Sequence, residues 1–265
     1  TWERRASMTL TRELKRRGVN VIARTAVDRV DTGANLGATV HYRQGDSDED
    51  RTAYGEVVLA AIGRVPNTDA DWFRSSGLKL DERGYVTVDG YGRTNLDGVW
   101  ALGDITPGHA LAHRAFEQGI TIAEKIAGAD PKPVLDDTVP QVVFSFPEAA
   151  SVGLTLDQAK AREDVVEPKE TAYPMLSNAR MLMSGEGGSM TVVSGAFANN
   201  PDMQVVLGVH IVSPIASDLI AEAEQLVGNR VPLADAARLI HPHPTFSETL
   251  GEALLKADGR PLHTR

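Results

Sequence analysis

The apolar positions of the chain change their period along its first part, and the changes predict a helix that leads into strands. Residues 6–17 carry apolar side chains one helical turn apart, end on basic residues and stop at Gly18, which is typical of a helix C-terminus. Apolar runs at residues 19–22, 38–42 and 55–61 predict strands, the last of them buried, because it lacks a clean alternation. A helix followed directly by strands is typical of a doubly wound α/β unit entered partway, so we expect its first strand to lie upstream of this chain.

The next stretch continues the α/β pattern around a Gly-Asp turn. Residues 84–89 alternate as a short strand, and residues 98–104 predict a second strand that ends on Gly103 and Asp104. Residues 110–127 place apolar side chains at helical spacing until a glycine ends the pattern. A long helix is therefore predicted after the Gly-Asp turn.

After a proline-rich linker at residues 130–134, the pattern changes to that of an antiparallel sheet with helices. The alternation predicts strands at 141–146, 189–196 and 205–212, a turn at 199–202, and helices at 216–227, 233–239 and after Pro244. The sequence thus predicts two architectures in succession, an α/β part and then an α+β domain.

Composition narrows the possible partners. The chain has 265 residues, which makes two folded units the expectation, since single domains mostly run to about 100–200 residues.

Its 27 Lys and Arg against 36 Asp and Glu give a net charge of -9, which argues against nucleic acids and anionic membranes as binding partners. No apolar run approaches the roughly 20 residues that span a bilayer, and residues 1–5 are not signal-like, so we expect a cytoplasmic protein.

The chain contains no cysteine. This excludes disulfide bonds, thiolate metal ligands and any dithiol redox chemistry within the chain itself. We expect no metal site.

Two motifs place ligand-compatible residues at strand ends. The segment 57–67 (VVLAAIGRVPN) predicts a strand that ends in Gly63, which has no Cβ to block a ligand. The segment 94–104 (TNLDGVWALGD) ends in Asp104, whose carboxylate can accept hydrogen bonds from sugar-like hydroxyls. Taken alone, each motif is also compatible with an ordinary strand end or turn.

A third motif, HPHPTFSE at residues 241–248, combines His243 with Glu248. Imidazole exchanges protons near neutral pH, and a carboxylate on one ring nitrogen fixes the tautomer and favours the protonated form. The alternative is structural, because Thr245-x-x-Glu248 is also a capping box for the helix that follows. His241 is interpreted as a packing or solvent-facing residue.

These motifs, in this order, resemble the flavoprotein (pyridine nucleotide) disulfide oxidoreductases, and within them the dihydrolipoamide dehydrogenases. The segment 142–153, the strand 207–213 and the sequence Asn178-Ala179-Arg180 also resemble that family, with Phe146 and Ser213 departing from its usual His and Gly. We interpret these three matches as structural or dimer-forming. The resemblance implies the C-terminal part of an NAD-binding domain at 1–63, that of an FAD-binding domain at 64–133, and an interface domain at 134–265.

The resemblance also implies cofactors and roles. FAD and NAD are the expected cofactors, with Gly63 beside the nicotinamide nucleotide, Val27 at the adenosine and Asp104 at the flavin ribityl chain. A helix start stabilises negative charge, such as that which the isoalloxazine gains on reduction. This places Ala110, Leu111, Ala112 and His113 at the flavin, with His113 in a packing role.

In the complete enzyme, the resemblance implies oxidation of dihydrolipoyl groups with NAD⁺. His243, oriented by Glu248, would exchange protons with the thiols across a homodimer whose subunits share the active site. The partners would be a lipoyl-bearing protein or a small disulfide substrate. We expect the Gly-rich phosphate loops and the redox cysteine pair to lie upstream, so this chain alone is expected to be inactive.

Two alternatives remain open at this point. One is a relative that reduces quinones or other acceptors without a thiol pair, and the other is an inactive dimerisation fragment. The choice between NAD and NADP also stays open, because the residue that makes it follows the Gly loop.

Overall fold

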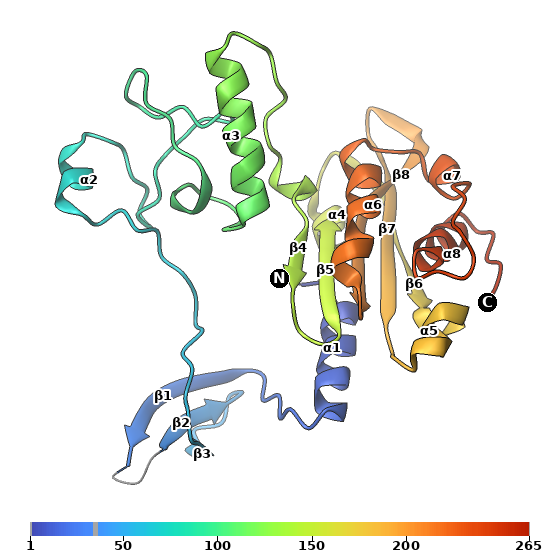
Figure 1. Cartoon of the computed structure of the whole chain (residues 1–265), viewed down its shortest axis with the longest axis horizontal. Coiled ribbons are helices and arrows are strands. Elements are labelled where there is room, and N and C mark those ends of the chain that lie inside the picture. The colour runs from blue at the N-terminus through green and yellow to red at the C-terminus, as the bar shows by residue number, and fades with distance from the viewer. Residues whose placement is uncertain (1, 34–36, 265) are drawn as a thin grey trace. The chain divides into compact units, whose positions relative to one another are not determined.

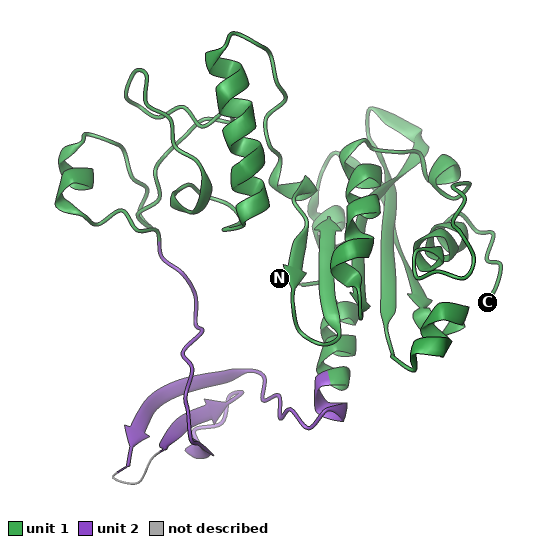
Figure 2. Cartoon of the chain, in the orientation of Figure 1, with its two compact units in different colours: residues 1–13, 66–265 green, residues 14–65 purple. Residues whose placement is uncertain are grey.

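The computed structural model describes residues 2–33 and 37–264. The chain divides into two compact units, coloured separately in Figure 2. Unit 1 comprises Thr1–Glu13 and Pro66–Arg265, and unit 2 comprises Leu14–Val65. The first helix, α1 (Arg4–Arg16), confirms the predicted N-terminal helix and contributes residues to both units.

A five-stranded antiparallel sheet forms the centre of the C-terminal part of unit 1 (Figure 1). In spatial order its strands are β4 (Gln141–Val143), β5 (Glu148–Gly153), β8 (Asn200–Ser213), β7 (Ser189–Phe197) and β6 (Val165–Pro174). The predicted strands at 189–196 and 205–212 are therefore confirmed as β7 and β8, whereas that at 141–146 is confirmed only over β4, which ends at Val143. The predicted turn at 199–202 is wrong, because Phe197 already pairs with Asn200 and the hairpin closes over two residues.

The middle of this sheet is buried on both faces. β8 supplies both clusters, with Val209 and Ile211 in the larger core and Val205 and Leu207 in a smaller one. These positions are two residues apart, and they reach different clusters because the register between β7 and β8 shifts between Val206 and Gly208. Two helices cover the larger core, since α6 (Ala216–Gly228) packs on β5 and β8 while α8 (Glu248–Ala257) packs on β6 and β7. The remaining helices of this part are α4 (Leu156–Ala161), α5 (Ala179–Ser184) and α7 (Leu233–Ala236).

A buried histidine lies inside the sheet. Ser151 donates its hydroxyl hydrogen to His210 Nδ1 at 2.7 Å, and His210 Nε2 donates to the carbonyl of Leu154 at 3.2 Å. Burial lowers the pKa of His210, so the ring stays neutral and satisfies both neighbours. This arrangement agrees with the structural interpretation of the strand at 207–213.

The residues between unit 2 and the sheet contain little regular structure. Their helices are α2 (Asp71–Ser75), α3 (Ala112–Ile126) and two 3₁₀ turns, η1 (Gly103–Ile105) and η2 (Asp136–Thr138). The predicted helix at 110–127 is confirmed as α3. The strands predicted at 84–89 and 98–104 are wrong, since each contributes only one isolated bridge, Leu80 to Val86 and Arg93 to Trp100.

Unit 2 is built around a three-stranded antiparallel meander. Its strands β1 (Thr25–Thr32), β2 (Ala38–Gln44) and β3 (Arg51–Gly55) pair in sequence order. Of the strands predicted here, only that at 38–42 is confirmed. Residues 19–22 and 56–61 form no strand, and the apolar side chains of the second segment are exposed, as is the neighbouring Ile62 at 97%. Within the part of the chain that the structure describes, this segment has no neighbouring strand to pair with.

The predicted fold class, mixed α/β followed by an antiparallel sheet with helices, is confirmed. Over residues 2–33 and 37–264, no helix is long and apolar enough to cross a membrane, and no cluster of three His, Asp or Glu residues has the arrangement of a metal site.

Gly208 allows β8 to approach the end of β5, and we predict that it cannot be enlarged. A Cβ at this position would meet the backbone of Leu154, which cannot move without opening the sheet. Gly208→Ala should therefore lower the free energy of unfolding by about 1–3 kcal/mol, the usual cost of overpacking. Urea denaturation followed by far-UV circular dichroism measures the change.

Gly119→Ala is the matched control. Its nearest contact would be Leu102 Cδ2 at 4.0 Å, and an alanine inside α3 should be neutral or stabilising by up to about 1 kcal/mol. Equal effects of the two substitutions would contradict the close approach at Gly208.

Candidate active site

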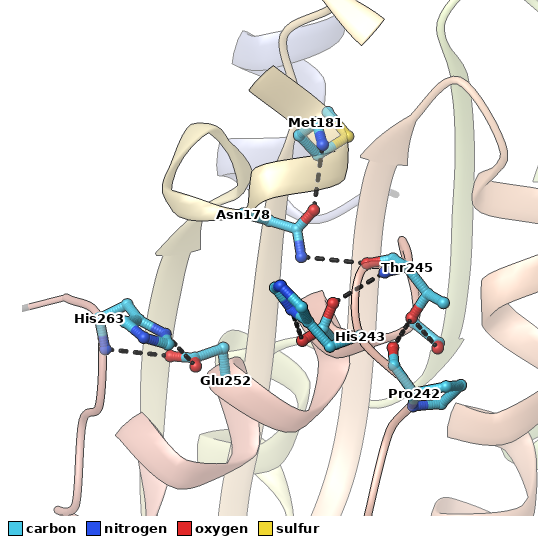
Figure 3. Close-up of polar contacts among 9 residues, drawn as sticks. Asn178, Met181, Pro242, His243, Thr245, Glu252 and His263 are labelled. Carbon is cyan, nitrogen blue, oxygen red and sulfur yellow. Dashed lines mark hydrogen bonds and ion pairs between the residues drawn. The ribbon is translucent and has the colours of Figure 1, made fainter. Parts of the chain in front are cut away.

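The candidate site lies where the connection between α7 and α8 meets the first turn of α8 (Figure 3). We call residues 241–247 the site loop. Thr245 closes this loop on itself, because its hydroxyl donates to the carbonyl of Pro242 at 2.6 Å and contacts the hydroxyl of Ser247 at 2.8 Å. The loop thus presents His243 beside the helix start.

The structure brings His243 and Glu248 together. His243 Nδ1 lies 2.9 Å from Glu248 Oε1, and the backbone N–H of Thr245 donates to Glu248 Oε2 at 2.8 Å. Since a carboxylate only accepts hydrogen bonds, Nδ1 carries the hydrogen and Nε2 is the basic nitrogen of the neutral ring. The imidazole is 72% exposed, so Nε2 can reach an outside group.

The electrostatic surroundings keep Glu248 ionised. Partial burial alone would raise the pKa of its carboxyl group, but the hydrogen bonds from Thr245 and His243 outweigh this and hold the pKa below its ordinary value. An ionised carboxylate beside Nδ1 holds the ring in one orientation. The pair can therefore take up a proton from an outside donor through Nε2.

The capping interpretation of the same residues is correct in part. Glu248 accepts the backbone N–H of Thr245, as the acidic residue of a capping box would. The hydroxyl of Thr245 does not reciprocate, because it donates to Pro242, and α8 begins at Glu248 after Ser247, whose side chain forms no cap. Glu248 therefore serves the helix start and His243 at the same time.

Asn178 connects the site loop to α5 and is only 5% exposed. Its Oδ1 accepts the backbone N–H of Met181 and caps α5, while its Nδ2 donates to the carbonyl of Thr245 at 3.1 Å. From the sequence, Asn178 was predicted only to have a structural or dimer-forming role, as part of Asn178-Ala179-Arg180. Its contact with the loop spans 67 residues of sequence, which no local pattern reveals.

His241 anchors the other end of the site loop. Its Nε2 lies 2.8 Å from Glu222 Oε1 on α6, and its ring packs against α8 at Gly251, where a Cβ would collide with the imidazole. The hydrogen bond with Glu222 raises the pKa of His241, although burial opposes the shift. This contact supports the packing role predicted for His241.

A second carboxylate–histidine pair shares the cavity beside His243. The cavity has a volume of about 230 Å³, and its walls include His243, Glu248, Tyr173, Glu252 and His263. His263 Nδ1 lies 2.7 Å from Glu252 Oε1. No sequence motif indicated this pair. The one local signal for Glu252 was its position one helical turn after Glu248.

The predicted flavin residues gather at the start of α3. Gly103, with φ of 72°, donates its N–H to Gln118 Oε1 at 2.9 Å, which ties η1 to α3 and leaves the adjacent Asp104 exposed. The helix begins at Ala112, and its N-cap residue Leu111 offers no side-chain acceptor. Its first amides are therefore available to an electron-rich group, which fits the flavin edge that the resemblance placed there.

His113 has a structural contact in this region. Its Nε2 lies 2.7 Å from the carbonyl of Pro140, which ties α3 to the start of β4. Ala110 precedes the helix and is half-buried. The hydrogen bond favours the packing role over acid–base chemistry for His113.

The two predicted NAD residues lie in unit 2. Gly63 has φ of 141°, and a Cβ at this position would meet none of the described atoms within 4 Å, which fits close approach by a ligand. The strand predicted to end at Gly63 does not form. Val27 lies inside β1 next to a bulge and is 59% exposed. Their roles at NAD stay predictions.

Comparison with known proteins identifies the family. The model of the pyridine nucleotide-disulphide oxidoreductases matches residues 1–119, and that of the dimerisation domain of the same proteins matches residues 139–254. The chain belongs to the pyridine nucleotide-disulphide oxidoreductase family.

Curated relatives bear the name dihydrolipoyl dehydrogenase. One from Cupriavidus necator is 38% identical, and the match spans 95% of this chain and 51% of the relative. One from Geobacillus stearothermophilus is 37% identical, and the match spans 99% of this chain and 54% of the relative. The chain therefore spans about half the length of the curated relatives it matches. The resemblance to this family is confirmed.

Solved structures agree with these sequence matches. LpdA from Mycobacterium tuberculosis superposes with a TM-score of 0.82 at 29% identity, over 97% of this chain and 53% of that protein. The flavoprotein disulfide reductase RclA from Escherichia coli, in its Cu(II) complex, superposes with a TM-score of 0.80 at 23% identity. This superposition covers 96% of this chain and 55% of RclA. At that identity the second match supports the fold alone.

We predict that Glu222 makes stability depend on pH through His241. Because the folded-state pKa of His241 is raised, its contribution is complete below the unfolded value of about 6.5 and is lost as the pH rises through the folded value. Glu222→Gln should remove this part of the decline in unfolding free energy above about pH 6.5. Urea unfolding at several pH values measures it.

Glu224→Gln is the control for this prediction, since Glu224 lies on the same helix and hydrogen bonds to Gln225 and not to a histidine. It should leave the pH profile of the native protein unchanged. If Glu222→Gln and the native protein show the same pH profile, the His241–Glu222 pair is not the cause of the pH dependence.

Proposed function

We propose that this chain forms the C-terminal half of an FAD- and NAD-dependent disulfide oxidoreductase that oxidises dihydrolipoyl dithiols. The observation that carries the proposal is the His243–Glu248 pair, which leaves a basic ring nitrogen exposed beside a cavity. The relatives named dihydrolipoyl dehydrogenase support it. A thiol-free reduction of quinones has less need of such a base.

His243 would act on the substrate thiol through Nε2. The thiol hydrogen moves to this nitrogen as the sulfur becomes a nucleophilic thiolate, and the Glu248 carboxylate stabilises the imidazolium that forms. The reverse transfer returns the proton when the reaction runs toward the dithiol. Asn178 and His241 keep the site loop in place on two sides of the ring.

The cofactors would be held by both parts of the chain. Asp104 would accept hydrogen bonds from the flavin ribityl chain, and the first turn of α3 would face the flavin edge through Ala112 and His113 backbone amides. Gly63 and Val27 would contact NAD. FAD and NAD supply the electron transfer when bound, while the residues of this chain bind them and move protons.

The chain contains no cysteine, so the redox dithiol would come from a segment outside it. We further propose the division into an NAD part at 1–63, an FAD part at 64–133 and an interface domain at 134–265. The dimerisation-domain match at 139–254 supports a homodimer in which His243 serves the active site of the other subunit. The protein partner would carry a lipoyl group.

Replacing His243 separates thiol chemistry from electron transfer. In the complete enzyme, His243→Gln keeps a polar side chain but removes the titrating base, so dihydrolipoamide oxidation should fall about 10²- to 10⁴-fold. NADH-driven reduction of an artificial acceptor needs no thiol base and should be largely retained. Both rates are measured per bound flavin.

Glu248→Gln should reduce thiol turnover less than His243→Gln does. Its amide can still accept the N–H of Thr245, and the imidazole stays in place, but the preference for a hydrogen on Nδ1 is lost. Equal losses in the thiol and acceptor assays, or no loss in either, would remove both residues from the active site. Acceptor reduction without thiol turnover in the native enzyme would favour the quinone-type alternative.

Asp104→Ala should weaken flavin retention in the complete enzyme without dissociating the dimer, because it removes a charge-assisted hydrogen bond to the cofactor. Flavin absorbance per subunit after gel filtration measures it. Asp97→Ala, an exposed aspartate of the same segment, is the control and should keep its flavin. Full flavin content in Asp104→Ala would refute the assignment.

A further inference from the structure

The cavity beside His243 contains a second imidazole that the proposed chemistry does not use. His263, in the C-terminal segment, and Glu252, on α8, form a pair that repeats the geometry of His243 and Glu248 (Figure 3). In both pairs Nδ1 faces the carboxylate. Among the described residues, Nε2 of neither ring has a hydrogen-bond partner.

The two pairs are supported by one helix face. Glu248 and Glu252 are separated by one turn of α8, and side chains at this spacing are neighbours on a helix surface. Both pairs line the same cavity of about 230 Å³. His263 is 66% exposed, whereas Glu252 is 11% exposed. The second pair therefore has its carboxylate in the cavity wall and its imidazole in contact with solvent.

Glu252 fixes the position of His263 with both oxygens. One oxygen faces Nδ1 at 2.7 Å, and the other accepts the backbone N–H of His263 at 3.3 Å. A nearly buried carboxylate with two donors on one residue holds that residue against α8. These two hydrogen bonds place His263 in the wall of the cavity.

The other lining groups cannot carry a proton near neutral pH. Burial, with the negative charges of Glu252 and Glu248, raises the pKa of Tyr173 to about 12, and within the described residues its hydroxyl has no partner. Glu248 stays ionised because its pKa is lowered. The remaining residues of the wall, Ser177, Asn178, Ala179 and Leu182, do not titrate.

The proton balance of the reaction gives such a group a role. Oxidation of a dithiol to a disulfide by NAD⁺ transfers two electrons and one proton to form NADH, so one proton must leave for the solvent in each turnover. His243 receives thiol protons, and it must lose one before the next cycle. Imidazole is the side chain whose ordinary pKa suits this exchange near neutral pH.

We propose that His263, positioned by Glu252, accepts this proton from His243, through water in the shared cavity, and releases it to solvent. The inference rests on the proposed function of His243. His263 acts through His243 and does not touch the substrate, and it is therefore a relay residue. Glu252 positions it through the two hydrogen bonds described above.

The test uses His263→Gln in the complete enzyme, with dihydrolipoamide oxidation measured at low buffer concentration and again with added imidazole. Glutamine can still donate to Glu252 but cannot carry the proton. Turnover at low buffer should fall about five- to tenfold, less than on loss of the base itself, and free imidazole should restore most of it. A residue with a merely structural role would not be rescued by buffer.

Arg260→Gln is the matched control. It breaks an ion pair with Asp258 in the same C-terminal segment, but Arg260 does not line the cavity. It should show neither the loss nor the rescue. Glu252→Gln should show a smaller loss with the same rescue, because His263 is less well held.

Three results would overturn the relay. These are an undiminished rate for His263→Gln, a loss that imidazole does not restore, or an equal loss for Arg260→Gln. His243→Gln in the same assay separates this failure from that of the proposed function. If His243→Gln also retains thiol turnover, the base itself is misassigned; if only His263→Gln does, the relay alone is wrong.

Discussion

The geometry of the candidate site depends on one carboxylate. Glu248 accepts the ring hydrogen of His243 with one oxygen and the backbone N–H of Thr245 with the other. Because Glu248 is also the first residue of α8, these two bonds fix the site loop to a helix that packs on β6 and β7. The imidazole thereby acquires a defined position relative to the central sheet, although most of its surface is exposed.

Other contacts prevent the loop from moving away from that carboxylate. Asn178 holds it from the side of α5, and Glu222 holds it through His241 from the side of α6. These two supports come from elements that precede the loop in sequence. A local rearrangement of the loop would therefore break two partly buried hydrogen bonds.

Helical periodicity and the HPHPTFSE motif were sufficient to predict α1, α3, α6 and the His243–Glu248 pair from the sequence. Both depend on residues close together in the chain. Strand predictions failed where the sheet partner is not within the described residues, as at 56–61, because an apolar run becomes a strand only when another strand accepts its hydrogen bonds. β1 was missed because its exposed side chains, several of them charged, show no clear apolar alternation.

Long-range contacts account for what the sequence left undetermined in the site. Asn178 reaches Thr245 across 67 residues, and His263 reaches back to Glu252 from a segment with no helical or strand pattern. These partners meet only in the folded chain, where α8 packs on β6 and β7. Glu248 showed two roles in the sequence, capping and orientation, and the structure combines them by giving each role one oxygen.

If Glu248 sets the tautomer of His243, the ring nitrogens report it directly. The measurement is the ¹⁵N chemical shift of both nitrogens in the histidine-labelled chain, at a pH where the ring is neutral, for the native sequence and for Glu248→Gln. The native ring should carry its hydrogen on Nδ1, with an unprotonated Nε2, and Glu248→Gln should shift the hydrogen toward Nε2. A native ring protonated on Nε2, or a tautomer that does not respond to the substitution, would contradict the role assigned to Glu248.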